Sequence, residues 1–237
     1  MSLVRPHVKQ VRKKMSNGIR CALIVFAKEP VLGTVKTRLR GCFSDEDLGR
    51  LYKAFVKDTL AVASNIRRSR KVLAFSSQQA PQFLKSVNSG FEMVEQRGRS
   101  LGDRMHNAFI YAHESKSKKI VIIGTDSPTL PPSMIEKAFK ELSRKDVVLG
   151  PSVDGGYYLI GMKVPCAAIF QGVRWSSASA LKKTLNNAKV LGKTTALLDE
   201  WYDVDDRDGL QRLKSHLELV KSKNIALNTR KFLKGGK

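Results

Sequence analysis

The stretch that decides the fold is residues 120–131, IVIIGTDSPTLP, a short apolar run that ends abruptly in Gly-Thr-Asp-Ser-Pro. Such closely spaced β-branched residues favour a strand that is buried on both faces, as strands of parallel sheets are. Parallel α/β sheets bind their ligands just beyond the carboxyl ends of the strands. Asp126 stands at such an end, before a Ser-Pro pair that disfavours an immediate helix. The segment therefore predicts a parallel α/β sheet with an acidic group at its ligand-binding edge.

Segments with strand patterns and segments with helix patterns alternate along the rest of the chain. The predicted strands cover residues 21–28, 71–76, 91–95, 120–125, 147–151, 157–162 and 194–198. The predicted helices cover residues 45–65 (after a Ser44 N-cap), 81–87, 101–113, 132–142, 176–188 and 206–220. This alternation predicts an α/β protein, a three-layer Rossmann-like sandwich around a mixed sheet.

The domain organisation follows from length and charge. A chain of 237 residues is long enough for one sizeable α/β domain, which we place at residues 20–217. Residues 1–19 are expected to be a basic extension, and residues 218–237 the end of the last helix and a basic tail.

The net charge of +22 is unusual. Residues 1–20 and 218–237 contribute half of it, and basic tails are commonly solvated. The basic body suits an anionic ligand such as a nucleotide, and no aromatic-interleaved RNA signature or zinc finger accompanies the charge. Nucleic-acid binding is therefore not expected to be the primary role.

The cellular compartment follows from two further observations. No apolar run approaches the roughly 18–20 residues that span a bilayer. Three cysteines, at positions 21, 42 and 166, are odd in number and lack metal-ligand spacing. A cytoplasmic protein without a membrane span is the simplest interpretation.

The loop after the first strand, FAKEPVLGTVKTRL at residues 26–39, is suited to phosphate. Gly33 would let backbone N–H groups approach an anion, while Lys28, Lys36 and Arg38 would neutralise its charge. It is not a Walker A motif, because no glycine directly precedes Lys36. The alternative is a solvated basic loop in which Gly33 serves a turn.

Asp126 has two interpretations. It could cap the helix that begins near Pro132, or bond the loop backbone. Six residues is far for a cap, and Mg²⁺ takes one or two carboxylates together with phosphate oxygens and waters. We therefore favour a metal ligand over a cap.

Two further segments carry acids. In GPSVDGGYY, residues 150–158, Asp-Gly is first of all a hairpin turn, although the second glycine would let a sugar or acceptor approach the backbone. In DVDDRD, residues 203–208, the acids could cap the last helix or supply a second carboxylate to a metal. The two roles can coexist, with Asp205 as ligand and Asp206 as cap.

The chain resembles a bacterial family of the nucleotide-diphospho-sugar transferase superfamily in five ordered segments: FAKEPVLGTVKTRL, SLGDRM, GTDSPTLPP, GPSVDGGYYLIG and DVDD. Members of this family are called glycosyltransferases of the arsenosugar-biosynthesis type. The 2-phospholactate and molybdenum-cofactor guanylyltransferases are related to them by fold. The resemblance covers residues 20–217 and leaves only the basic tails outside.

The resemblance implies a GT-A type fold and a set of site residues. The phosphates would be held by Gly33, Lys36, Thr37 and Arg38, and the nucleoside would lie along Leu101, Gly102 and Arg104. Asp126 would bind Mg²⁺ (or Mn²⁺) and Asp205 would be the second metal ligand. Asp154, Gly155 and Gly156 would face the acceptor or sugar. The family usually has Thr-Pro after the last metal Asp, where this chain has Asp206-Arg207, and this weakens the assignment of Asp205.

The implied activity is transfer from a nucleotide-activated donor to a small-molecule acceptor. Lys36 and a metal on Asp126 would stabilise the leaving phosphate, and Asp154 would act as a base. Glycosyl transfer from a nucleotide-diphospho-sugar is the first expectation. The alternative is nucleotidyl transfer from a nucleoside triphosphate with release of pyrophosphate, as in guanylyltransferases. A basic protein that associates with nucleic acid is the third.

Overall fold

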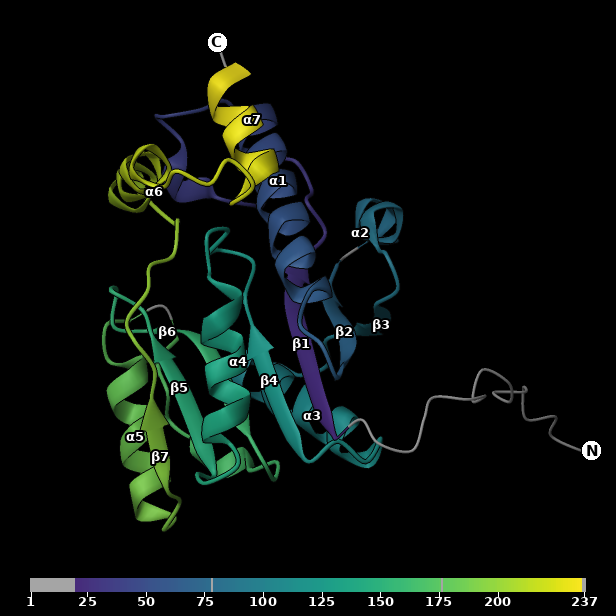
Figure 1. Cartoon of the computed structure of the whole chain (residues 1–237), viewed down its shortest axis with the longest axis vertical. Helices are drawn as coiled ribbons and strands as arrows, with labels where there is room; N and C mark the ends of the chain where they lie inside the picture. Colours follow the sequence, from purple (N-terminus) through teal and green to yellow (C-terminus); the bar gives the residue numbers. More distant parts are fainter. Residues whose placement is uncertain (1–19, 78, 176, 236–237) are drawn as a thin grey trace, which may run out of the picture.

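A mixed β-sheet forms the centre of the protein (Figure 1). The computed structural model describes residues 20–77, 79–175 and 177–235, and within them seven strands form one sheet in the order β3-β2-β1-β4-β6-β5-β7. The strands are β1 (Cys21–Lys28), β2 (Ser69–Ser76), β3 (Glu92–Glu95), β4 (Lys119–Ile123), β5 (Val147–Pro151), β6 (Tyr157–Met162) and β7 (Thr195–Leu197).

The directions of the strands bring several carboxyl ends to one edge of the sheet. β1 pairs in parallel with β2 and β4, and β5 pairs in parallel with β7. β6 runs antiparallel to both of its neighbours, β4 and β5. The prediction of a mixed sheet is therefore confirmed, and the loops after β1, β4, β5 and β7 emerge together.

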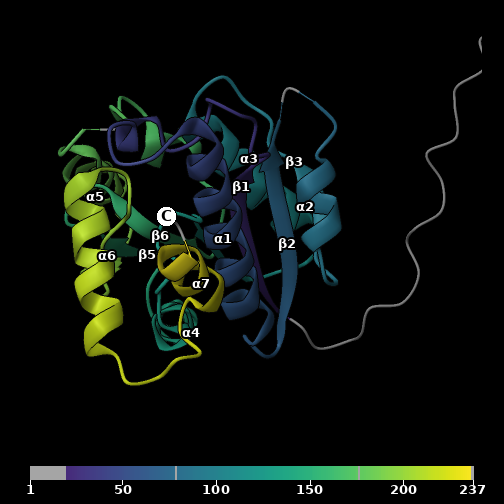
Figure 2. The same cartoon turned by 90° about the horizontal axis from the view of Figure 1, so that it is seen from above.

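Helices cover both faces of the sheet, which gives the predicted three layers (Figure 2). The longer helices are α1 (Asp45–Ser64), α3 (Leu101–Glu114), α4 (Pro132–Glu141), α5 (Ala180–Val190) and α6 (Arg207–Leu219), and α2 (Gln82–Val87) is short. Successive residues of β1 point to opposite faces of the sheet and so belong to two different apolar cores. Leu23 and Val25 pack with residues of α1 and α4, whereas Ala22 and Ile24 pack with residues of α3 and α5.

A third apolar cluster lies beyond the carboxyl edge of the sheet, where α6 and α7 (Leu227–Gly235) stand in Figure 1. It joins Leu39 of the short 3-10 helix η1 (Thr37–Leu39), the first half of α1, Val204, α6 and the approach to α7. Leu39 and Val204 are fully buried. The cluster therefore anchors the loop after β1 through Leu39 and the DVDD segment through Val204.

Helix α7 was not predicted. The sequence indicated a basic tail, but residues 227–235 form a helix that packs on α1 and places Phe232 against Phe43, with ring centroids 5.6 Å apart. The segment is basic, but its apolar residues lie on one face of the helix, and this face packs on α1. The N-terminal extension, residues 1–19, lies outside the described residues.

The predicted elements are present, with differences at their ends. β1, β5 and β6 have the predicted bounds, and Ser44 caps α1 by accepting a hydrogen bond from the Asp47 N–H. The predicted start of the fifth helix, Ser176, lies outside the described residues, and α5 begins only at Ala180. In the described part of the chain, none of the helices is both long and apolar enough to cross a membrane.

Candidate active site

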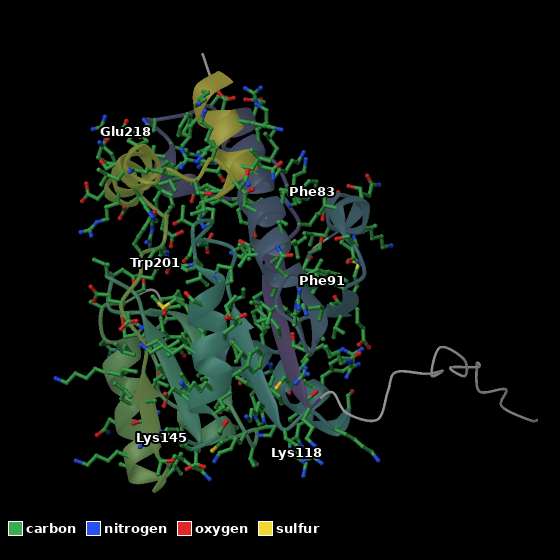
Figure 3. All side chains as sticks on the ribbon, viewed as in Figure 1. Phe83, Phe91, Lys118, Lys145, Trp201 and Glu218 are labelled. Carbon is green, nitrogen blue, oxygen red and sulfur yellow. The ribbon has the colours of Figure 1, made fainter. Side chains whose placement is uncertain are left out.

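Four loops meet at the carboxyl edge of the sheet, and hydrogen bonds between their side chains hold them together. Lys36, in the loop after β1, bonds to Asp126, in the loop after β4, and to Asp205, which precedes α6. Ser127 and Ser152 both bond to Asp203. The backbone adds a further link, because the Val204 N–H donates to the Asp126 carbonyl at 2.9 Å. In Figure 3, Trp201, which precedes Asp203 in the chain, lies near the carboxyl edge of the sheet.

Lys36 is a buried cation between two carboxylates. Its Nζ donates to Oδ1 of Asp126 and, at 2.8 Å, to Oδ1 of Asp205. The Lys36 side chain is 3% exposed, whereas those of Asp126 and Asp205 are 42% and 45% exposed. The Nζ also lies 5.4 Å from the centre of the Phe55 ring.

The ion pairs dominate the ionisation of this group. Burial alone would lower the pKa of Lys36, but the charges of Asp126 and Asp205 outweigh it and hold that pKa above its ordinary value. Burial likewise acts to raise the pKa of Asp205, but Lys36, Arg38 and Lys28 hold it below its usual range. A cationic and an anionic group therefore stay charged side by side at neutral pH.

The backbone at Lys36 is strained. Its φ of 53° and ψ of 32° place a non-glycine residue in the left-handed region. Val35 and Leu39 on either side are buried, so the loop is anchored at two points while Thr37 and Arg38 between them are exposed. This arrangement directs the Lys36 side chain inward and leaves the next two residues free to meet a ligand.

Gly33 explains the turn of the same loop. It adopts a φ of 73°, and its carbonyl accepts a hydrogen bond from Arg40 at 3.0 Å. Lys28 ends β1 with an exposed side chain, and its backbone N–H donates to the Tyr52 hydroxyl at 2.9 Å. That hydroxyl lies 3.0 Å from Oγ1 of Thr125, which precedes Asp126. Tyr52 therefore ties the ends of β1 and β4 together from α1.

The structure brings Asp126 and Asp205 together and removes one alternative for Asp126. The N-cap position of α4 is Pro131, and no side chain caps that helix. Asp126 is therefore no helix cap, and its carboxylate is directed at Lys36. Asp206 does cap α6, since its Oδ1 accepts from the Gly209 N–H at 2.9 Å, as predicted.

Asp203 is a site residue that the sequence analysis missed. Its side chain is largely buried, and its carboxylate accepts hydrogen bonds from the hydroxyls of Ser127 and, at 3.1 Å, of Ser152. Burial raises its pKa to about 6, and the charges of Asp126, Asp205 and Asp154 act in the same direction. Asp203 and Asp205 flank the buried Val204, and their carboxylates contact different partners, the two serines for Asp203 and Lys36 for Asp205. The Asp-x-Asp spacing around an apolar residue was the available signal.

The Asp-Gly-Gly turn between β5 and β6 lies beside this group. Asp154 is exposed, and its Oδ1 accepts from the Gly156 N–H at 2.9 Å. Gly155 has a φ of 83°, and a Cβ there would lie 2.3 Å from the carbonyl oxygen of Ala178. The space that the missing side chain of Gly155 leaves is therefore occupied by the backbone of Ala178.

The predicted nucleoside residues occupy the first turn of α3. Ser100 and Asp103 form a capping box, and Leu101 is 40% exposed. Gly102 is buried against Phe170 and Trp175. A Cβ at this position would lie 2.8 Å from Phe170 and 3.0 Å from the Trp175 ring, so a larger residue would not fit. Among the described residues, no hydrogen bond connects this turn to Lys36, Asp126, Asp203 or Asp205.

The two carboxylates fit a hard divalent cation. Mg²⁺ takes one or two carboxylates and completes its shell with phosphate oxygens and waters. Asp126 and Asp205 supply such a pair, both partly exposed and both already contacting one cation. No group of three or more His, Cys, Asp or Glu side chains with metal-binding geometry occurs in residues 20–77, 79–175 or 177–235, so the protein alone would not complete the shell.

Comparisons with known proteins agree with this fold. Residues 59–177 match the model of a family described as an uncharacterized protein conserved in bacteria (DUF2064). Over 156 residues the chain is 26% identical to the 2-phospho-L-lactate guanylyltransferase of Methanocaldococcus jannaschii. That match covers 63% of this chain and 62% of the relative, so the chain spans less than two thirds of the curated relative.

Solved structures give a closer match over the whole fold. A protein of Desulfovibrio desulfuricans G20 that is proposed to be a nucleotide-diphospho-sugar transferase superimposes with a TM-score of 0.81. It is 27% identical, and the match covers 90% of this chain and 98% of that one. The inositol-1-phosphate CTP transferase of T. maritima gives a TM-score of 0.52 at 17% identity, with 93% and 99% covered, and shows the fold alone. The resemblance to nucleotide-diphospho-sugar transferases and guanylyltransferases is therefore confirmed.

Proposed function

The chain belongs to the DUF2064 family of uncharacterized proteins conserved in bacteria, and we propose that it is a metal-dependent transferase that uses a nucleotide-activated donor. One observation carries this proposal. Asp126 and Asp205, which are far apart in the sequence, meet at the carboxyl edge of the sheet beside an exposed loop that holds Thr37 and Arg38. An acid pair next to basic side chains suits a divalent cation and a polyphosphate together.

The residues of the chain divide the work between binding and proton transfer. Lys28, Lys36 and Arg38 would attract the phosphates, and Asp126 and Asp205 would hold Mg²⁺ or Mn²⁺. When bound, such an ion supplies positive charge to the departing phosphate group. We assign the acceptor proton to Asp154, because it is exposed and does not bond to Lys36.

Glycosyl transfer from a nucleotide-diphospho-sugar is the first candidate. The similarity to the D. desulfuricans protein supports it, because that match extends over 90% of this chain. In this reaction the acceptor attacks the anomeric carbon of the sugar, its proton passes to the base, and a nucleoside diphosphate leaves.

Nucleotidyl transfer is the second candidate, and the 26% identity to a guanylyltransferase favours it. Here a phosphate of the acceptor attacks the α-phosphate of a nucleoside triphosphate, and pyrophosphate leaves. The same basic loop and acid pair would serve both reactions, because both develop negative charge on a phosphate group.

The test combines binding with product release. Calorimetry with Mn²⁺ and UDP-glucose, GDP-mannose, CTP or GTP identifies the donor, and incubation of the preferred donor with fractionated small molecules shows what leaves. Nucleoside diphosphate supports the first candidate and pyrophosphate the second. Asp126→Ala should lose Mn²⁺-dependent nucleotide binding, whereas Asp206→Ala, one residue from Asp205 but used as a helix cap, should keep it. Retained binding in Asp126→Ala refutes the proposed site.

A further inference from the structure

We propose that Lys36 is an internal cation that competes with the divalent ion for Asp126 and Asp205 and passes to the donor phosphates when that ion binds. This inference rests on the proposed function and adds an order to it. In the structure, Lys36 contacts one oxygen, Oδ1, of each of the two carboxylates that would hold the ion. A divalent ion held between the same two carboxylates would stand close to the buried ammonium, and the repulsion between the two positive charges makes them compete for this position.

The geometry allows Lys36 to leave. The two carboxylates are 42% and 45% exposed, so an ion from solvent can reach them although the ammonium itself is buried. The side chain of lysine is a flexible four-carbon stem that can carry its charge to a new partner. The residues that follow it, Thr37 and Arg38, are exposed on the ligand side of the loop.

The backbone supports the same conclusion. Lys36 is held in the left-handed region although it is not a glycine, while its neighbours Val35 and Leu39 are anchored in two different cores. Strain of this kind persists where the surroundings enforce it and concentrates at binding and switch segments. Here the strained residue is the one whose side chain bridges the carboxylates.

The exchange couples the two ligands. A buried ammonium without a partner is costly, so Lys36 leaves the carboxylates readily only when a phosphate oxygen receives it. The metal then neutralises Asp126 and Asp205, which would otherwise repel each other. Because binding linkage is reciprocal, the nucleotide raises the affinity for the metal by the same factor as the metal raises that for the nucleotide.

The test measures the affinity for Mn²⁺ alone, by electron paramagnetic resonance of the free ion. Lys36→Met should bind Mn²⁺ at least about tenfold more tightly than the wild type, because the competitor is gone. Lys36→Arg keeps the cation and should remain near the wild-type affinity. Lys28→Met removes one nearby positive charge that makes no hydrogen bond to the carboxylates, and should tighten binding by no more than about threefold, the effect of a screened charge.

The outcomes separate this inference from the proposed function. If Lys36→Met binds Mn²⁺ no more tightly than Lys28→Met while Asp126→Ala abolishes binding, the metal site stands and the exchange is refuted. If the wild type and Lys36→Met both fail to bind Mn²⁺ at millimolar concentration, the metal site itself is refuted. Should Lys36→Met not fold, the wild type labelled with ¹³C at lysine Cε gives the answer. Saturating Mg²⁺ together with pyrophosphate should shift the Lys36 signal, and an unmoved signal overturns the proposal.

Discussion

Replacing Asp58 with alanine should loosen α7 and, through it, the rim of the active site. Asp58 lies on α1, is 4% exposed, and accepts four hydrogen bonds from the start of α7. Two come from Asn228, through N at 2.9 Å and Nδ2 at 2.8 Å. Two come from Thr229, through N at 2.8 Å and Oγ1 at 2.6 Å. The carboxylate thus caps the N-terminus of a helix to which it does not belong.

The magnitude follows from the groups left behind. Loss of a helix cap costs about 1–2 kcal/mol, and the fully buried Thr229 hydroxyl would lose its acceptor at about another 1–3 kcal/mol. We expect Asp58→Ala to lower the free energy of unfolding by about 3 kcal/mol. Urea denaturation followed by circular dichroism measures this change.

A matched control lies on the same helix. Asp45 bonds to Arg40 at the surface, and Asp45→Ala should cost no more than about 1 kcal/mol. The functional consequence follows from the apolar cluster that joins Leu39 and Val204 to α6 and the segment before α7. Asp58→Ala should therefore also weaken Mn²⁺ binding, although it touches no site residue. An unfolding free energy within about 1 kcal/mol of wild type, or a loss no larger than that of Asp45→Ala, refutes this account of α7.

Three further results are expected. Gly155→Ala should destabilise the protein by about 2 kcal/mol more than Gly90→Ala in thermal unfolding, because the two share a φ near +84° but only the first meets a backbone oxygen, at 2.3 Å. Asp206→Ala should lower the unfolding free energy by about 1 kcal/mol through loss of the α6 cap, and an unchanged value would contradict that role. Hydrogen bonds from Thr194 lower the pKa of Asp146 to about 2, so Thr194→Val should raise it in a carboxyl NMR titration. Because this pKa is depressed, the Asp146 carboxylate stabilises the fold above pH 4 and loses that effect as pH falls toward 2. In Asp146→Asn, the free energy of unfolding should lack this part of its decrease between pH 4 and pH 2.

Local patterns were sufficient for the sheet and for the two acids of the proposed metal site. The β-branched run before Asp126 predicted a buried strand, and β4 ends at Ile123 with all of its last four residues buried. Strand order and direction place loops by rule, so residues predicted at strand ends were correctly expected to gather at one edge. Asp205 was expected to be a second metal ligand with Asp126, and the structure brings both carboxylates into contact with Lys36.

What the sequence could not supply are contacts between distant segments. Lys36 was assigned to phosphates, and its bonds to carboxylates 90 and 169 residues away depend on how the loop folds back. Helix α7 was missed because its short sequence holds as many basic as apolar residues, and because the carboxylate that caps it, Asp58, lies 170 residues earlier in the chain. Asp203 was missed because its partners, Ser127 and Ser152, belong to two other loops.

The charge of the site argues for a small ligand of mixed sign over a nucleic acid. Around one edge of a basic protein the fold gathers Asp126, Asp154, Asp203 and Asp205, so closely that the other three charges add to the effect of burial in raising the pKa of Asp203. A long polyanion laid across this edge would meet four acids, which oppose it. A metal and a polyphosphate together would satisfy both signs, since the acids would take the cation and the exposed basic loop would take the anion. The net charge of +22 therefore does not by itself indicate a nucleic-acid ligand, and the acid cluster supports the metal and the polyphosphate that we propose.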